Sequence, residues 1–219
     1  MSEVELLNWI RGPALQIATV IFVVGIVVRI LEVLVLGRKT DLAEARGSGV
    51  AGGFRTMLTR SFPDRGTLAR STFVVIAGYV FHVGFLLTVF FYTPHILLFR
   101  ESFGVSWPAL PTPVIDALTV VTLIALVAVL IHRLQHKVMR FLSTFQDYLV
   151  WLVTFLPVLT GYLAFHRLFL EPEMMLTVHI ATVELFMVVF PFTKLMHAFT
   201  LFMARYYTGS IAGRKGVNT

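Results

Sequence analysis

The 219-residue sequence contains no cysteine. The chain therefore cannot ligate a conventional iron–sulfur cluster, form a disulfide or attach haem covalently through a C-x-x-C-H motif. Charge is also scarce, because Asp, Glu, Lys and Arg make up 14% of the residues, against about 25% in soluble domains. Walker loops, dinucleotide-binding fingerprints and metalloprotease helices are missing as well. These absences exclude several common classes of nucleotide-binding and metal-binding enzyme.

What the sequence has in excess is apolar residues, at 57% of the total. They are gathered into five long runs, at residues 13–36, 71–99, 114–131, 148–165 and 174–203. A helix needs about 20 apolar residues to cross a bilayer. Inside lipid, the backbone polar groups must be satisfied within the segment, which favours helices. We therefore predict an all-α membrane protein, with residues 1–219 forming one domain of five transmembrane helices.

The distribution of basic residues predicts the orientation of these helices. Lys and Arg concentrate in the loop 37–70, between the third and fourth runs, and at the C-terminus, whereas the other side carries few of them. By the positive-inside rule, the N-terminus is outside and the C-terminus is cytoplasmic in a multi-pass protein of the inner (cytoplasmic) membrane. Because the basic residues lie in loops, the net charge of +6 does not indicate nucleic-acid binding. We expect no cleavable signal peptide, since the N-terminus begins with Glu3 and Glu5 and the first run is long enough to span.

The loop 37–70 is the only extended polar region of the sequence, and it contains glycine pieces that we expect to be flexible. It is either a connecting loop biased by topology or a docking surface for a cytoplasmic subunit.

The last apolar run contains two histidines, His179 and His197, separated by eighteen residues. On one continuous helix, eighteen residues make five full turns, so both imidazoles would leave the same face about 27 Å apart. That distance is close to the ~30 Å thickness of the hydrocarbon core. The segment is therefore expected to offer a nitrogen ligand near each side of the membrane.

The second run contains two more histidines, His82 and His95. Antiparallel packing of the two runs would bring His95 near His179 on the outer side, and His82 near His197 on the inner side. We therefore predict two haem b groups, each held by a pair of axial histidines. Thirteen residues separate His82 from His95, which on a straight helix rotates them about 140° apart. Pro94 can relieve this mismatch by kinking the helix.

The other polar residues of the runs allow further roles. Any of the histidines can instead be a core residue bonded to a neighbouring carbonyl, although ionisable groups within a bilayer are functional candidates by default. His166 is the rival of His95 as outer ligand, and otherwise a candidate proton acceptor for a quinol. Glu184 can carry a proton or bond a neighbouring helix. Lys194 and Arg205 flank His197 and can hold haem propionates through charge-assisted bonds, or simply mark the cytoplasmic boundary.

These residues resemble the membrane cytochrome b family of respiratory nitrate reductase gamma subunits. The likeness lies in the two histidines of the fifth run, in the segment Phe190-Pro191-Phe192-Thr193-Lys194-Leu195-Met196-His197, and in Phe81-His82-Val83-Gly84. The wider spacing of the histidines in the second run and the short loop before the fifth are closer to the short members from sulfite-reductase-associated and other sulfur-metabolism complexes. The resemblance implies electron exchange with a cytoplasmic iron–sulfur partner subunit on the inner side and with quinol or quinone on the outer side.

The sequence thus predicts a di-haem b electron-transfer subunit of a respiratory complex, rather than a complete enzyme. Both directions of electron flow, quinol oxidation and quinone reduction, remain open, as do the terminal substrate and the type of quinone. One alternative is a small transporter or proton-conducting protein whose histidines titrate. Another is a structural anchor for a peripheral complex.

Overall fold

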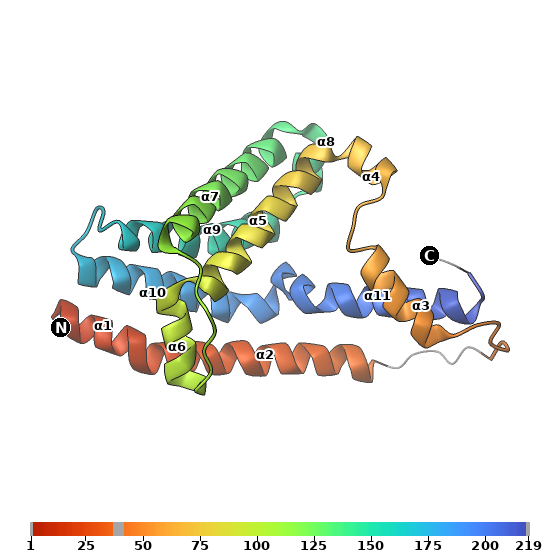
Figure 1. Cartoon of the computed structure of the whole chain (residues 1–219), viewed down its shortest axis with the longest axis horizontal. Helices are drawn as coiled ribbons and strands as arrows, with labels where there is room; N and C mark the ends of the chain where they lie inside the picture. Colours follow the sequence, from red (N-terminus) through yellow and green to blue (C-terminus); the bar gives the residue numbers. More distant parts are fainter. Residues whose placement is uncertain (1, 37–41, 218–219) are drawn as a thin grey trace. The chain divides into compact units, whose positions relative to one another are not determined.

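The computed structural model describes residues 2–36 and 42–217, and every regular element in this part of the chain is a helix (Figure 1). In order, the elements are α1 (Glu3–Trp9), a π-helical turn η1 (Ile10–Ala14), α2 (Leu15–Val35), α3 (Gly49–Thr59), α4 (Arg65–Arg70), α5 (Thr72–Phe91), α6 (Thr93–Phe103), α7 (Thr112–Gln135), α8 (Lys137–Leu142), α9 (Phe145–Phe165), α10 (Pro172–Val189), the 3₁₀ turns η2 (Phe190–Phe192) and η3 (Lys194–Met196), and α11 (His197–Arg214).

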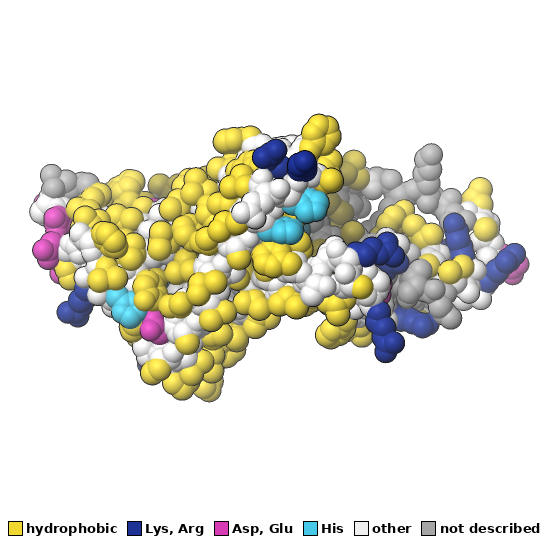
Figure 2. Space-filling model, turned by 90° about the horizontal axis from the view of Figure 1, so that it is seen from above, with side chains coloured by type: hydrophobic (Ala, Val, Ile, Leu, Met, Phe, Trp, Pro, Cys, Tyr) yellow, Lys and Arg dark blue, Asp and Glu magenta, His cyan; other side chains and the backbone are white. Residues whose placement is uncertain are grey.

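Five helical segments are long and apolar enough to cross a membrane, which confirms the predicted number of spans. They are Glu3–Val35, Thr72–Phe91, Thr112–Gln135, Phe145–Phe165 and Pro172–Phe192. The protein is therefore a multi-pass helical membrane protein. Its surface agrees with this, because hydrophobic side chains cover most of the face seen in Figure 2. The side of the membrane on which each end lies stays a prediction.

The chain forms two compact units. The first unit contains residues 1–19 and 73–189, and the second contains residues 20–72 and 190–219. In the first unit, α9 packs against α10 and α7. Helix α5 approaches α7 closely at Gly84, where a Cβ atom would overlap the hydroxyl of the fully buried Thr122. Gly84 is thus needed for this helix contact, because only a glycine leaves room for it.

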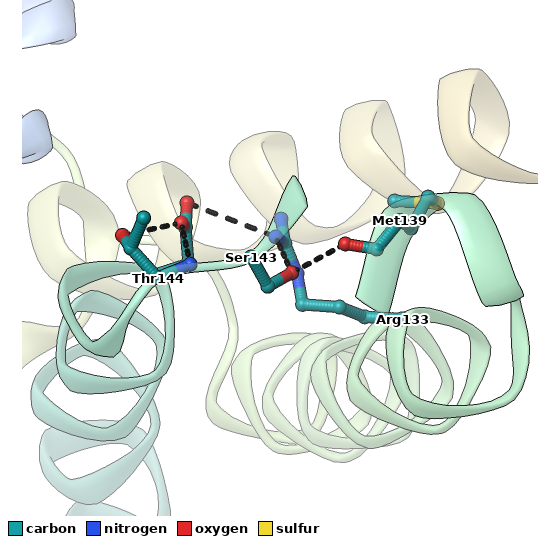
Figure 3. A network of polar contacts seen from close by, with 5 residues as sticks. Arg133, Met139, Ser143 and Thr144 are labelled. Atoms are coloured by element: carbon teal, nitrogen blue, oxygen red, sulfur yellow. Dashed lines mark hydrogen bonds and ion pairs between the residues drawn. The ribbon is translucent and has the colours of Figure 1, made fainter. Parts of the chain in front are cut away.

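A polar network joins the end of α7, the short helix α8 and the start of α9 within the first unit (Figure 3). The Arg133 guanidinium donates to Ser143 Oγ at 2.9 Å and lies 3.7 Å from the Asp147 carboxylate. Ser143 Oγ donates to the Met139 carbonyl at 2.7 Å. Asp147 also accepts from the backbone N–H of Thr144, which begins α9 with a capping box. These bonds satisfy helix-end groups and fix the turn between two spans.

In the second unit, α3 packs on α11 through glycines on both helices. A Cβ at Gly52 would lie 2.5 Å from the Gly209 carbonyl oxygen, and one at Gly53 would lie 2.6 Å from the Tyr206 ring. Gly209 and Gly213 are four residues apart, the spacing that lets helix backbones approach closely. The expectation that Gly52 and Gly53 are flexible loop residues is therefore wrong, since they lie within a packed helix.

The fifth span also differs from its prediction. Helix α10 ends at Val189, two 3₁₀ turns follow, and Thr193 between them is fully extended, with φ −129° and ψ −178°. His197 is the first residue of a separate helix, α11. The prediction of one continuous helix over 174–203 is wrong, so the five-turn spacing that would put His179 and His197 on one face about 27 Å apart no longer follows.

The physical reason for this break lies in the packing of Pro191. Proline removes a helix hydrogen bond and its ring crowds the preceding turn. Here the ring is seated against Gly25 of α2, where a Cβ atom would lie 2.6 Å from the Cβ and Cγ atoms of Pro191. Phe190 packs edge-on against Phe22 at 5.1 Å, and the Thr193 hydroxyl accepts from the Leu195 N–H. Tertiary contacts within the second unit thus stabilise the interruption.

Candidate functional site

The second span is interrupted beside His95. Helix α5 ends at Phe91, Tyr92 is extended with φ −82° and ψ 129°, and α6 begins with Thr93 and Pro94. A helix end leaves its last four carbonyls without intrahelical partners. The kink expected at Pro94 is therefore a complete break, and it frees carbonyl acceptors next to a histidine.

All four of these carbonyls accept a hydrogen bond from outside α5. The Thr88 and Val89 oxygens accept from His95 Nδ1 at 3.2 and 3.1 Å. The Phe90 oxygen accepts from the indole Nε1 of Trp107 at 2.6 Å, and the Phe91 oxygen accepts from the backbone N–H of Leu110 at 3.0 Å. The His95 ring thus caps the C-terminal end of α5, and these hydrogen bonds fix its position.

His95 lies beside His179 of α10. The two imidazole rings have centroids 6.3 Å apart and planes inclined by 20°. Both side chains belong to the first unit. The structure therefore brings together the two histidines that the sequence predicts as the outer pair.

His179 is positioned by α9. The Thr160 hydroxyl donates to the Leu156 carbonyl at 2.8 Å and lies 3.3 Å from His179 Nδ1. When its proton is donated to that carbonyl, the Thr160 oxygen is available to accept from Nδ1–H. The next residue, Gly161, leaves room for the ring, since a Cβ there would lie 3.0 Å from His179 Cε1. Both Nδ1 atoms of the pair are thus occupied by protein acceptors, which leaves each Nε2 with its lone pair.

The ring separation of this pair matches the separation of two imidazoles that share one haem iron. An imidazole nitrogen binds a first-row metal at about 2 Å. The ring centre lies about 1.1 Å from that nitrogen, given ring bonds near the ~1.33 Å of a peptide C–N bond. The metal–nitrogen distance and the nitrogen–centre distance, added on both sides of an iron, put the ring centroids of a bis-histidine site about 6 Å apart. This value agrees with the observed 6.3 Å. Ligating histidines also donate their other ring N–H to a protein acceptor, as His95 and His179 do.

The predicted inner ligands share one of these properties. His82 Nδ1 donates to the Gly78 carbonyl at 2.7 Å, and His197 Nδ1 donates to the Lys194 carbonyl, also at 2.7 Å. His82 belongs to the first unit and His197 to the second. Their pairing across a haem stays a prediction. Among the described residues there is no group of three or more His, Asp or Glu side chains that would hold a bare metal ion.

His166, the rival outer ligand, has a different partner. Its Nε2 lies 2.8 Å from the Asp116 carboxylate of α7, and both side chains are about one-third exposed. Contacting aromatic rings connect this pair to the histidine site: His95 to Tyr92 at 5.3 Å, Tyr92 to Phe165 at 6.1 Å, and Phe165 to His166 at 4.8 Å. The Nε2 atom of His166 is therefore engaged with Asp116, and the pair lies two rings away from His95.

The remaining predicted residues are Glu184, Lys194 and Arg205. Glu184 is in α10, and its buried Oε1 atom has no hydrogen-bond partner among the described residues. Lys194 is in η3, where its carbonyl holds the His197 ring. Arg205 of α11 donates to Ser61 Oγ at 3.1 Å and so links α11 to the segment after α3. The predicted propionate contacts of Lys194 and Arg205 stay predictions.

Three residues of the site were missed by sequence reasoning. Asp116 carried a usable signal, because it is an ionisable residue inside an apolar run. Thr160 and Gly161 carried none, since threonine and glycine are common in membrane helices and their role depends on a histidine in another span.

Comparison with known proteins gives a family but no function. No protein-family model matches the chain, and no solved structure matches it. A protein of Nitratidesulfovibrio vulgaris (strain Hildenborough), named simply "Protein", is 33% identical over 208 residues, which cover 92% of this chain and 91% of the relative. Identity at this level along nearly the full length of both chains requires a common fold and descent. The chain therefore belongs to the same family as this N. vulgaris protein.

Proposed function

We propose that the protein is a membrane electron-transfer subunit that binds two haem b groups, one between His95 and His179 and one between His82 and His197. The observation that supports this most is the geometry of the first pair. Its ring separation of 6.3 Å suits an iron between the two Nε2 atoms. When bound, the haems would supply one-electron transfer across the membrane.

The residues of the chain hold and tune each group. The Thr88 and Val89 carbonyls and the Thr160 hydroxyl fix the ring orientations by accepting from Nδ1–H, which leaves Nε2 for the iron. The absence of cysteine means that such haems are held by ligation and packing alone. The inner group relies on the His82 and His197 rings, with Lys194 and Arg205 as proposed propionate contacts.

The proposed quinone site lies at the His166–Asp116 pair. An imidazole nitrogen 2.8 Å from a carboxylate oxygen provides two adjacent groups between which a proton can pass. Quinol oxidation releases protons together with electrons, so it needs such an acceptor near the outer haem. The same pair can return the proton in the reverse direction, quinone reduction. Glu184, five residues beyond His179 in α10, is a second candidate for proton transfer.

The proposed partner is a cytoplasmic iron–sulfur subunit. Since the chain has no cysteine, it does not itself supply the thiolates of an iron–sulfur cluster. Electrons that reach the inner haem would pass to a separate protein. The chain is in this proposal one subunit of an oxidoreductase, and the terminal substrate depends on the partner.

The test is the reduced-minus-oxidised spectrum of the purified full chain, expressed with ample haem. We expect a b-type signal equivalent to about two haems per chain. His179→Ala should remove about half of that signal, because it deletes one axial ligand of one group. His95→Ala should remove the same half, so the double variant should lose no more than either single variant.

The matched control is His166→Ala, which deletes an imidazole engaged with Asp116 and should keep the full signal. His82→Ala should remove the other half, and combining it with His179→Ala should leave a colourless protein. An unchanged spectrum in His179→Ala would reject this ligand assignment. A colourless wild-type chain would reject the whole proposal.

A second candidate function, proton conduction, is favoured by Glu184. A carboxyl oxygen that is buried in a membrane helix and has no hydrogen-bond partner among the described residues is costly and calls for a role. The hydroxyls of Thr160 and Thr182 lie 2.9 Å apart, and the Thr160 hydroxyl lies 3.3 Å from His179 Nδ1, so these three polar side chains adjoin one another. The spectrum above separates the two candidates, since proton conduction requires no haem.

A further inference from the structure

Helix α3 has an apolar face that α11 does not cover. Val50, Phe54 and Leu58 are spaced four residues apart, so they form one stripe along the helix. They are 59%, 57% and 70% exposed, and Phe62 just beyond the helix end is 75% exposed. The opposite face, with Gly53 and Thr56, is buried. With 11 residues, α3 is too short to cross a bilayer, so this stripe is not the surface of a span.

The surroundings of this stripe are basic. Residues 42–72 contain five arginines and two acids, which gives a net charge of +3. All five arginines are exposed: Arg46, Arg55, Arg60, Arg65 and Arg70. Of the two acids, Asp64 is committed to the start of α4, where the Thr67 side chain and backbone bond its carboxylate and hold its pKa below the ordinary value. The excess of exposed positive charge complements an anionic surface.

The chain also restricts how far α3 can move from a membrane. Residues 36–48 connect it to the end of the span formed by α1 and α2, and residues 60–71 connect it to the start of the span α5. Each connection is thus only about a dozen residues long, and the second contains the helical turn α4, which shortens its reach. Both ends of α3 are therefore tethered near a membrane–water interface.

We propose that α3 lies in the membrane surface, with Val50, Phe54 and Leu58 in the headgroup region and the neighbouring arginines on the phosphates of anionic lipids. An amphipathic helix in this position buries its apolar face about 5–10 Å into the boundary between headgroups and acyl chains. Basic residues close to a span attract anionic lipids. This inference does not depend on haem binding.

A lipid surface suits the stripe better than a protein partner does. Protein interfaces carry roughly one hydrogen bond per 100–200 Å² of buried surface, which requires polar groups among the apolar ones. The outward residues of α3 from Val50 to Leu58 are aliphatic or aromatic except for Arg55, and they include no amide or hydroxyl side chain. Such a surface is matched by acyl chains, with headgroups around it.

The test uses spin labels, because a cysteine-free chain allows one label at one chosen site. Phe54→Cys and Leu58→Cys variants of the full chain are labelled and placed in nanodiscs of phosphatidylcholine mixed with phosphatidylglycerol. Oxygen concentrates in lipid and a nickel chelate in water, so the ratio of the two accessibilities reports depth. Val24→Cys, on the exposed face of the span helix α2, gives the lipid value, and Glu44→Cys gives the aqueous value.

We expect the labels at Phe54 and Leu58 to give ratios between those at Val24 and Glu44, as a position at the headgroup boundary requires, and to become shallower in nanodiscs of phosphatidylcholine alone. Ratios equal to that at Glu44 in both lipids would overturn the proposal. Low accessibility to both reagents would also overturn it, because the face would then be covered by protein. Equal depth in the two lipids would overturn the role given to the arginines. Unchanged elution in size-exclusion chromatography verifies that each labelled variant is folded.

Discussion

Two of the predicted spans are interrupted in the described part of the chain, at Tyr92 in the first unit and at residues 190–196 in the second, and the two breaks are made in different ways. After α5, each of the four carbonyls left at the helix end is bonded by a residue outside that helix, including His95 and Trp107. After α10, the break contains two 3₁₀ turns and is seated by Pro191 on Gly25. The first break is thus fixed by hydrogen bonds and the second by packing.

This difference predicts which substitutions each break tolerates. A break that is held by hydrogen bonds is sensitive to the loss of a hydrogen-bond donor. A break that is held by packing is sensitive to side-chain volume added at the contact. In both cases the break determines the direction of the histidine that follows, because His95 donates from Nδ1 to carbonyls freed at the end of α5 and His197 donates from Nδ1 to a carbonyl of η3. The breaks therefore belong to the candidate site as much as the histidines do.

The largest effect is expected from Gly25→Ala. Its Cβ would lie 2.6 Å from two ring atoms of Pro191, which cannot rotate away. Overpacking of this kind costs about 1–3 kcal/mol. The matched control is Gly78→Ala in α5, where a Cβ meets nothing within 4 Å. We expect the thermal midpoint in detergent to fall for Gly25→Ala and to stay level or rise for the control. Equal midpoints would show that Pro191 does not seat the second break.

A smaller effect is expected from Trp107→Phe at the first break. The substitution keeps the aromatic ring and removes the donor to the Phe90 carbonyl, now bonded at 2.6 Å. A carbonyl left without its partner costs about 1–3 kcal/mol, and less where water reaches it, as it can at this exposed bond. Denaturant unfolding of the full chain measures the change. Trp9→Phe in α1 is the control, because that indole is half exposed. A drop of equal size in both variants would contradict the hydrogen-bonded account.

The smallest effect on the fold is expected from Thr160→Val. This substitution affects one histidine of the outer pair and leaves the other unchanged. Valine has nearly the same shape and removes the acceptor of His179 Nδ1, while the bonds of His95 are untouched. Loss of such a supporting bond lowers metal affinity about tenfold or more. We expect unchanged unfolding, a weaker retention of one haem during dilution, and a shifted midpoint potential for that haem. Thr154→Val, at a buried threonine of the same helix, is the control.

The spans were predictable from the sequence, because long apolar runs are decided by composition. The breaks were only half predictable, and the prolines show why. Pro157 lies inside an uninterrupted α9, whereas Pro94 and Pro191 lie at breaks. A proline in a membrane helix can be accommodated by neighbouring groups. Its outcome depends on contacts such as that of Pro191 with Gly25, which join residues far apart in the sequence.

The candidate site shows the same division. The pairing of His95 with His179 followed from the order and depth of two spans, and the structure places their rings together. The acceptors of their Nδ1 atoms could not be predicted, since Thr160 gains its role from the packing of α9 on α10. The helical character of residues 49–59 was missed, because the glycines at 49, 52 and 53 are typical of a loop. Their role in helix packing is visible only from their contacts with α11, which contains Gly209 and Gly213.

The glycine contact between α3 and α11 has a consequence for biosynthesis. A ribosome makes α3 after the first span and α11 only after the other four, so the two halves of this contact emerge about 140 residues apart. During most of translation α3 exposes the glycine face that α11 later covers. The second unit can therefore close only after α11 has been made, which makes this contact one of the last to form.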